Sequence, residues 1–263
     1  MIENGSVSRR TFLMAAGAMA IARPAAAASA GTPILAYHRF DAARAGPTAV
    51  TTATFELQLR SLARLGFDVV PLRDAVARLQ APQRDGARQA AITVDDGHRS
   101  VHTLLFPLIR RLKLPVTLFI YPSAISNAAY AMTWEQLREM RASGLVDVQS
   151  HTYWHPNFAT ERRRRTPAAF AAFVDDQLQR SRRTIEARLG GRVDMLAWPF
   201  GIVDPMLEEA ARRAGYSAAL AYEGGPASAG ADPFALPRIP VGEADRGSAF
   251  ARKLGLAARE PTQ

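Results

Sequence analysis

Short apolar runs alternate with amphipathic segments along most of the chain. Residues 90–94 and 116–121 are nearly continuous apolar runs, which are typical of strands that are buried on both faces of a sheet. Residues 54–65 instead place Phe55 and Leu62 on one face of a helix. The whole pattern predicts strands at 32–37, 67–70, 90–94, 116–121, 145–149, 193–198, 217–221 and 236–241, and helices at 54–65, 72–79, 101–112, 134–142, 168–189 and 205–214.

The alternation of strands and helices indicates an α/β fold with a parallel sheet, either closed into a barrel or doubly wound. The chain has 263 residues, of which 48% are hydrophobic, and this is enough to bury one sizeable core. We predict a single domain with the architecture of a distorted (β/α) barrel of about seven parallel strands.

Polar motifs directly follow several of the predicted strands. Asp95 and Asp96 follow one strand, and His151 follows another. Pro199 and Phe200 follow a further strand. In (β/α) barrels the carboxyl ends of the strands lie on one face, and that face carries the reacting groups. We therefore expect these motifs to meet at one site.

The adjacent carboxylates of Asp95 and Asp96 would be costly to bury without a positively charged partner. Gly97 would let the backbone turn sharply after them. An Asp-Asp-Gly sequence on its own is an ordinary turn. The pair therefore indicates a functional site only in combination with the other motifs.

Two of the five histidines of the chain, His151 and His155, lie four residues apart after a predicted strand. Pro156 and the preceding strand favour a loop for this segment over a helix. Imidazole is a common zinc ligand, and two imidazoles close in sequence favour one shared metal ion. A structural or exposed histidine pair is the alternative.

Together, these segments resemble the motifs of the polysaccharide deacetylases (the NodB-homology group, carbohydrate esterase family four). The likeness spans roughly residues 33–241, and it includes the stretches 34–39 and 133–144. The positions that match the family's three motifs are Thr93 to Gly97 in the first, His151, Thr152 and His155 in the second, and Pro199, Phe200 and Gly201 in the third.

The resemblance implies that Asp96, His151 and His155 bind a divalent metal, usually zinc, with cobalt and nickel as alternatives. It further implies that Asp95 is the general base toward a metal-activated water, and that the backbone N–H of Phe200 stabilises the oxyanion. The implied reaction removes N-acetyl groups from an exopolysaccharide or cell-wall polysaccharide that contains N-acetylglucosamine.

The chain departs from the family pattern where an orienting arginine and a general acid are expected. Ala197 replaces the arginine of the third motif, and Arg238 replaces the histidine of a late Leu-x-His motif. The family's Asp-x-x-Asp-Trp motif is also missing. These departures occur together in the branch that resembles deacetylases of poly-β-1,6-N-acetylglucosamine. We expect Arg238 to orient Asp95, and His38 to be either the acid, a partner of the site or a core histidine.

Aromatic residues near the motifs could provide faces on which sugar rings stack, although most strand-end aromatics pack in the core. We expect Trp154, Tyr121 and Pro199 to contact the substrate, with Trp154, between two predicted metal ligands, as the best candidate.

The formal net charge of +9 could attract nucleic acid, anionic lipid or anionic wall polymer. Since no nucleic-acid-binding motif accompanies the charge, we predict no nucleic-acid partner. The charge run at 161–165, one glutamate and four arginines, is interpreted as a solvated segment that leads into a helix, with contact to an anionic polymer as the alternative. The chain has no cysteine, which excludes disulfides and thiolate metal sites. We predict a monomer without a transmembrane segment.

Residues 1–30 have the order of a signal peptide, with Arg9 and Arg10 before a modest apolar stretch. The arginine pair resembles the twin-arginine export signal, and Ala28 to Ala30 fits a cleavage site. An ordinary N-terminal helix or a membrane anchor is the alternative. We expect residues 31–263 to form the catalytic domain, exported by the twin-arginine route to the periplasm or the extracellular space.

Two other functions remain compatible with the motifs. The missing acid would suit a non-catalytic polysaccharide-binding protein with the same fold and metal. A hydrolase of another small amide or of an O-acetyl ester is a further alternative. A glycosidase is less favoured, because it needs two separated carboxylates and not an adjacent pair beside histidines.

Overall fold

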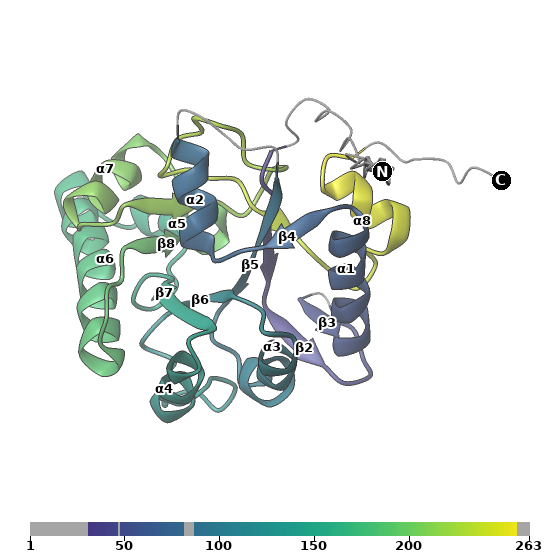
Figure 1. The fold of residues 1–263 in the computed structure, drawn as a ribbon. Coiled ribbons are helices and arrows are strands. Elements are labelled where there is room, and N and C mark those ends of the chain that lie inside the picture. Colours follow the sequence, from purple (N-terminus) through teal and green to yellow (C-terminus); the bar gives the residue numbers. More distant parts are fainter. Residues whose placement is uncertain (1–30, 47, 82–86, 257–263) are drawn as a thin grey trace, which may run out of the picture.

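The computed structural model describes residues 31–46, 48–81 and 87–256 (Figure 1). Its strands are β1 (Ile34–Tyr37), β2 (Arg39–Asp41), β3 (Ala49–Thr51), β4 (Phe67–Val69), β5 (Arg88–Asp95), β6 (Val116–Ile120), β7 (Val146–Ser150), β8 (Met195–Ala197), β9 (Ala218–Leu220) and β10 (Ile239–Pro240). Its helices are α1 (Thr52–Arg64), α2 (Leu72–Gln80), α3 (Phe106–Leu112), α4 (Trp134–Ala142), α5 (Phe158–Arg163), α6 (Pro167–Leu189), α7 (Pro205–Arg213) and α8 (Gly247–Lys253).

The main sheet is parallel throughout, with the strand order β10-β1-β5-β6-β7-β8-β9 and with β4 paired to the start of β5. From β5 to β9 the strands are neighbours in the order in which they occur in the chain, without the reversal that defines a doubly wound sheet. The predicted α/β fold with a (β/α) barrel architecture is therefore confirmed.

The segment that leads into β10 connects the two edges of the sheet. The N–H of Leu236 donates to the carbonyl of Ala219 at 3.0 Å, and the N–H of Ala221 donates to the carbonyl of Leu236 at 2.9 Å. A few residues later, the N–H of Val241 donates to the carbonyl of Ala36 at 3.1 Å. Residues 236–241 thus lie between β9 and β1, and they bring Arg238 to the inside of the barrel.

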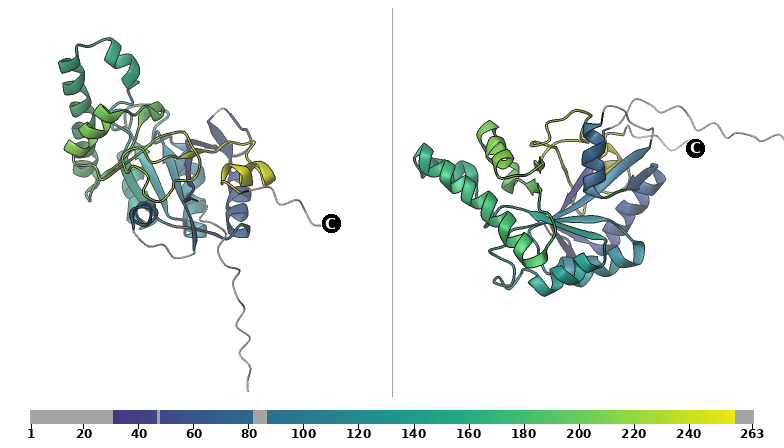
Figure 2. Two further views of the ribbon diagram at one scale, coloured as in Figure 1. Left: turned by 90° about the horizontal axis from the view of Figure 1, so that it is seen from above. Right: turned by 60° about the vertical axis from the view of Figure 1, so that its left-hand side comes forward.

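Helices surround the curved sheet (Figure 2). Helices α4 and α6 pack against β7, whereas α1 packs against β4 and α2 against β5. The buried core is apolar and follows the strands, with Leu35, Ile92 and Leu118 almost completely inaccessible. Burial of such side chains from both faces of the sheet explains why the strands are continuous apolar runs in the sequence.

Local signals in the sequence set the bounds of the helices next to the site. Helix α4 begins at a capping box, in which Thr133 accepts a hydrogen bond from the N–H of Gln136 and the Gln136 side chain accepts one from the N–H of Thr133. Helix α6 begins after the N-cap Thr166 and ends at Gly190, whose positive φ of 72° interrupts the helical path.

The structure differs from the predicted pattern in one helix and several short elements. The helix predicted at 101–112 begins as a π-helical segment, Val101–Leu105, before α3. Pro107 has no N–H to donate to the preceding turn, which favours this looser backbone. Strands β2 and β3 and helices α5 and α8 are too short to give a periodic signal in the sequence.

No helix within residues 31–46, 48–81 and 87–256 is both long and apolar enough to cross a membrane. The predicted signal peptide at 1–30 lies outside the described residues.

Candidate active site

The strand ends lie at one level of the barrel. Asp95 at the end of β5 is paired with Phe119 of β6, and Phe119 is paired with Gln149 of β7. The residues that follow β5 and β7 therefore leave the sheet at the same edge. This register brings the Asp95–Asp96 pair and His151 together, as the motifs predicted.

A tight turn separates the two aspartates. The N–H of Gly97 donates to the carbonyl of Asp95 at 3.0 Å, and Asp96 between them has a φ of 71°, as in a γ-turn. Gly97 has a φ of 70°, and a Cβ there would lie 2.9 Å from Cδ1 of Ile125. As a result Asp95 is buried, whereas Asp96 is partly exposed.

Hydrogen bonds from both the backbone and the ring of His151 fix the start of the histidine loop. The N–H of His151 donates to the carbonyl of Ile120 at 2.8 Å. Nδ1 of His151 lies 2.7 Å from the carbonyl oxygen of Ala197, which can only accept, so Nδ1 carries the proton. Nε2 is then the unprotonated nitrogen, and it lies 3.8 Å from Oδ1 of Asp96. A backbone carbonyl that accepts from one ring nitrogen and so fixes the tautomer is typical of metal-binding histidines.

His155 completes a group that could hold a metal ion. Its Nε2 lies 3.8 Å from Oδ1 of Asp96, and one ligand atom each from Asp96, His151 and His155 lies within 4.8 Å of the others. Two imidazoles and one carboxylate form a donor set that suits zinc, and three protein ligands leave a position for water or substrate. The residues present therefore fit a divalent metal.

The environment keeps both imidazoles in the form that binds metals. Burial lowers the pKa of His151, although Asp95 and Asp96 act in the opposite direction. Burial, and then the neighbouring His151, lower the pKa of His155 to about 4. Both rings are consequently neutral near pH 7, and a neutral imidazole is the form that binds metals.

Arg238 is the positively charged partner of Asp95. Its Nη1 lies 2.7 Å from Oδ1 of Asp95, and its Nη2 lies 2.8 Å from Oδ2. Nε of Arg238 donates to the carbonyl of Ala221 at 2.8 Å, and Nη1 also donates to Oγ1 of Thr93 at 3.2 Å. The guanidinium is thus fixed in one orientation, and the bidentate pair fixes the carboxylate.

Burial by itself would raise the pKa of Asp95, but the charge and the hydrogen bonds of Arg238 outweigh it and hold the pKa well below its usual range. Asp95 is therefore an anion near pH 7. Its Oδ2 lies 3.8 Å from Nε2 of His151, so the carboxylate faces the group of possible metal ligands.

His38 and Tyr222 pack against each other on the side of the site where Arg238 contacts Asp95. The half-buried ring of His38 meets the ring of Tyr222 edge-on, with 5.3 Å between the ring centres. Cζ of Arg238 lies 5.9 Å from the centre of the Tyr222 ring. Burial and then the charge of Asp95 raise the pKa of Tyr222. Sequence reasoning missed Tyr222, although its place just after β9 is of the same kind as that of the other motifs.

The third motif forms a strained turn above the histidines. Phe200 has a φ of 57°, and 57% of its side chain is exposed. Its ring centre lies 4.7 Å from that of His155. Pro199 is buried, so its side chain is placed to shape the turn and not to contact a sugar. Positive φ at Asp96, His155 and Phe200 places backbone strain at the proposed reacting centre.

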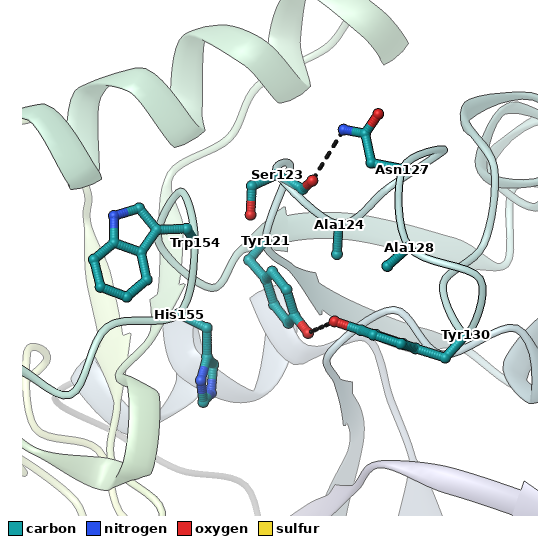
Figure 3. A pocket seen from close by; sticks show the side chains of 8 residues that line it. All are labelled: Tyr121, Ser123, Ala124, Asn127, Ala128, Tyr130, Trp154 and His155. Carbon is teal, nitrogen blue, oxygen red and sulfur yellow. Dashed lines mark hydrogen bonds between the residues drawn. The ribbon is translucent and has the colours of Figure 1, made fainter.

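A pocket of about 420 Å³ opens beside His155 (Figure 3). Tyr121 lies in the middle of the pocket, with Trp154 and His155 on one side of it and Tyr130 on the other. The hydroxyl of Tyr121 is 2.6 Å from the hydroxyl of Tyr130. Trp154 is 41% exposed. The structure therefore places Trp154 and Tyr121, both predicted to contact the substrate, in one pocket next to the possible metal ligands.

A family model described as polysaccharide deacetylase matches residues 83–219, about half of the chain, and this stretch includes both aspartates and both histidines of the site. The chain belongs to the polysaccharide deacetylase family. The family predicted from the motifs is thus confirmed, and with it an enzyme of the hydrolase class that acts on carbon–nitrogen bonds.

Curated relatives have low overall identity. YxkH of Bacillus subtilis strain 168 is 25% identical over 220 residues, which cover 83% of this chain and 74% of YxkH. The poly-β-1,6-N-acetyl-D-glucosamine N-deacetylase of Escherichia coli strain K12 is 21% identical over 243 residues. That match covers 78% of this chain and 35% of the relative, so the chain spans about a third of that enzyme.

Solved structures support the fold. IcaB from Ammonifex degensii superposes with a TM-score of 0.75 at 25% identity, covering 85% of this chain and 97% of IcaB. The deacetylase PplD of Streptococcus pyogenes, solved in complex with acetate, has a TM-score of 0.72 at 19% identity, covering 85% of this chain and 98% of PplD.

Proposed function

We propose that this polysaccharide deacetylase removes N-acetyl groups from a polymer that contains N-acetylglucosamine. The single observation that carries the proposal is the position of the ion-paired base candidate Asp95, 3.8 Å from a histidine of the Asp96–His151–His155 group. The names of the relatives from Escherichia coli and Staphylococcus aureus, both poly-β-1,6-N-acetyl-D-glucosamine N-deacetylases, support this class of substrate.

Asp96, His151 and His155 would hold the metal, zinc by preference, which when bound polarises the acetyl carbonyl and activates water. Asp95 takes the proton of the attacking water, because its carboxylate is ionised and faces this group. Arg238 engages both oxygens of Asp95, and this keeps the carboxylate oriented while its charge changes. The N–H of Phe200 donates to the oxyanion that forms on the acetyl group.

The amide carbon–nitrogen bond breaks once the nitrogen receives a proton. We assign this proton to His38, because its half-buried ring lies against Tyr222, which packs beside Arg238, the partner of Asp95. Acetate and a free amine on the sugar are the products. The proton held by Asp95 then returns to His38 or to solvent, which restores the starting state.

The site of action is part of the same proposal. A polymer outside the cytoplasm requires an exported enzyme, and the arginine pair at the N-terminal end of the sequence supports the twin-arginine route to the periplasm or beyond.

The test is acetate release from β-1,6- and β-1,4-linked N-acetylglucosamine oligomers by the purified protein. We expect release to stop after chelation and to return with added zinc or cobalt. His155→Asn should lose both bound metal and activity; asparagine is chosen because it tolerates the positive φ at this position. His102→Gln is the matched control, since His102 pairs with Glu139 at 2.8 Å outside the site and should behave as the wild type.

Two results would count against the proposal. Acetate release that survives chelation would remove the metal from the mechanism. No release from any oligomer with zinc or cobalt supplied would favour a polysaccharide-binding protein, and release only from a small amide or an O-acetyl ester would favour the remaining alternative.

A further inference from the structure

The pocket beside His155 lies between two loops that follow neighbouring strands. Its lining comes from residues 121–130 after β6 and from Trp154 and His155 after β7 (Figure 3). It has a volume of about 420 Å³ and is largely open to solvent. Since His155 belongs to the possible metal ligands, a molecule in this pocket would contact the reacting centre directly.

The pocket is uncharged although the chain carries a net charge of +9. Its lining consists of aromatic rings, two alanine methyl groups, three hydroxyls and an amide, from Tyr121, Ser123, Ala124, Asn127, Ala128, Tyr130, Trp154 and His155. The lining contains no aspartate, glutamate, lysine or arginine. This lining favours a neutral ligand over an anionic one.

The two tyrosines present a preorganised pair of hydroxyls. In a hydrogen bond of 2.6 Å one phenol donates, so the other keeps its proton for an acceptor outside the pair. The Tyr130 ring stacks on His98 with 6.3 Å between ring centres, and Nδ1 of His98 lies 2.8 Å from Oγ of Ser100.

Trp154 supplies a flat apolar face on the other side of the pocket. Its backbone N–H donates to Oε1 of Gln177 at 3.1 Å, and its ring lies 5.9 Å from that of Phe173. The ring is thus supported from behind while 41% of the side chain stays exposed. A pyranose ring has an apolar C–H face and hydroxyls around its edge, which match one aromatic wall and one hydroxyl wall.

We infer that this pocket binds the neutral pyranose ring next to the one that loses its acetyl group, with Trp154 as the stacking face and the Tyr121–Tyr130 hydroxyl pair as the hydrogen-bonding wall. The inference rests on the proposed function. It assigns to Tyr130, which no sequence motif singled out, a role in selecting the substrate. It also makes the enzyme dependent on chain length, because a single N-acetylglucosamine cannot occupy both positions.

The test compares the metal-loaded wild type with Tyr130→Phe and Trp154→Ala on N-acetylglucosamine oligomers of one to five sugars. The wild type should show a steep rise in kcat/KM between one and two or three sugars. The ratio of kcat/KM on the longer oligomers to kcat/KM on the single sugar should be about fivefold smaller in Tyr130→Phe than in the wild type. This change should come through KM, as expected when one hydrogen bond is removed. In Trp154→Ala the same ratio should be about tenfold smaller or more, because a whole stacking face is removed.

Tyr153→Phe is the matched control, because Tyr153 lies in the same loop as Trp154 but outside the pocket lining. It should retain the wild-type dependence on chain length. The inference is overturned if Tyr130→Phe has the wild-type dependence, or if it loses the same factor on the single sugar as on the longer oligomers.

Equilibrium binding of the same oligomers to the full chain after metal removal, followed by tryptophan fluorescence, needs no turnover. If Tyr130→Phe binds the oligomers more weakly than the wild type does, but the metal-loaded wild type releases no acetate, the pocket is supported and the proposed function is contradicted. If the metal-loaded wild type releases acetate, but Tyr130→Phe binds as tightly as the wild type, the pocket alone is contradicted. Tighter binding of uronic-acid-containing oligosaccharides than of neutral ones would overturn the assignment of a neutral ligand.

Discussion

Both carboxylate oxygens of Asp95 accept hydrogen bonds from the guanidinium of Arg238, at 2.7 and 2.8 Å, and both side chains are almost completely buried. The two residues are 143 positions apart in the chain. Ala197 stands where the family has an orienting arginine, and the sequence predicted that Arg238 takes over this role. The structure shows that Arg238, directly before β10, contacts both oxygens of the carboxylate.

Arg238→Lys should therefore impair the chemical step. A lysine can supply the charge but not the planar pair of donors, so Asp95 would lose its fixed orientation. We expect kcat to fall by about a hundredfold, with KM little changed and metal content intact. Steady-state kinetics with metal analysis would check this, and an unchanged kcat would show that the bidentate contact is not needed for turnover.

The same variant should change the pH profile. Arg238 lowers the pKa of Asp95, and the proposed base is active only as the carboxylate. Activity that depends on Asp95 is therefore lost as the pH falls through this pKa. With a weaker partner the pKa rises, so the acidic limb of kcat/KM should move to higher pH in Arg238→Lys. If the acidic limb of the profile does not move in the variant, the group that produces it is not Asp95.

His38→Ala tests the proposed proton donor. General acid catalysis typically contributes a factor of about 10² to 10⁴, so kcat should fall by at least about a hundredfold while the metal remains bound. The loss should be smaller on an acetyl ester with a good leaving group, because such a group leaves without a proton. Equal turnover by variant and wild type would exclude His38 from the mechanism and leave it as a packing partner of Tyr222.

The metal-free protein should lose stability in mild acid. Burial and His151 lower the pKa of His155 from 6.5 to about 4 in the folded chain. Between these values the unfolded chain binds the extra proton, so stability falls as the pH drops from about 6.5 to about 4 and is unaffected by this group outside that window. Between pH 6.5 and pH 4, urea unfolding of the chelated protein should show a loss of stability that is about 3 kcal/mol smaller in His155→Asn than in the wild type. An identical pH dependence in the variant would contradict the assignment.

Gly97→Ala should damage the turn that separates the two aspartates. The new Cβ would meet Cδ1 of Ile125 at 2.9 Å, in addition to the strain of a φ of 70°. Gly144→Ala is a matched control, because Gly144 has a φ of 73° but nothing within 4 Å of the added carbon. We expect about 1 kcal/mol of destabilisation in the control and about 2–4 kcal/mol in Gly97→Ala, measured by urea unfolding. Equal losses would show that Ile125 can move aside.

The sequence was sufficient for the fold class because buried parallel strands give continuous apolar runs, and the helices between them have a clear period. It was also sufficient to bring Asp96, His151 and His155 to one place, since motifs after parallel strands must meet at one edge. The altered motif predicted that Arg238 contacts Asp95. The structure adds that this contact consists of two hydrogen bonds, one to each carboxylate oxygen.

Other features depend on contacts that have no local signal. Tyr222 reaches the site because β9 ends beside β8, and its ring is placed by His38 from the opposite end of the chain. The hydroxyl pair of Tyr121 and Tyr130 forms only because the loop after β6 folds back on itself. Pro199 looked like a substrate contact because of its motif, but the turn buries it and exposes Phe200.

The segment 236–241 lies between β9 and β1 and joins the two edges of the sheet. The metal-ligand candidates all come from loops that precede residue 156, whereas Arg238 comes from this closing segment. The orientation of Asp95 therefore depends on closure of the barrel, and a change that loosens this segment would act on catalysis without touching a metal-ligand candidate.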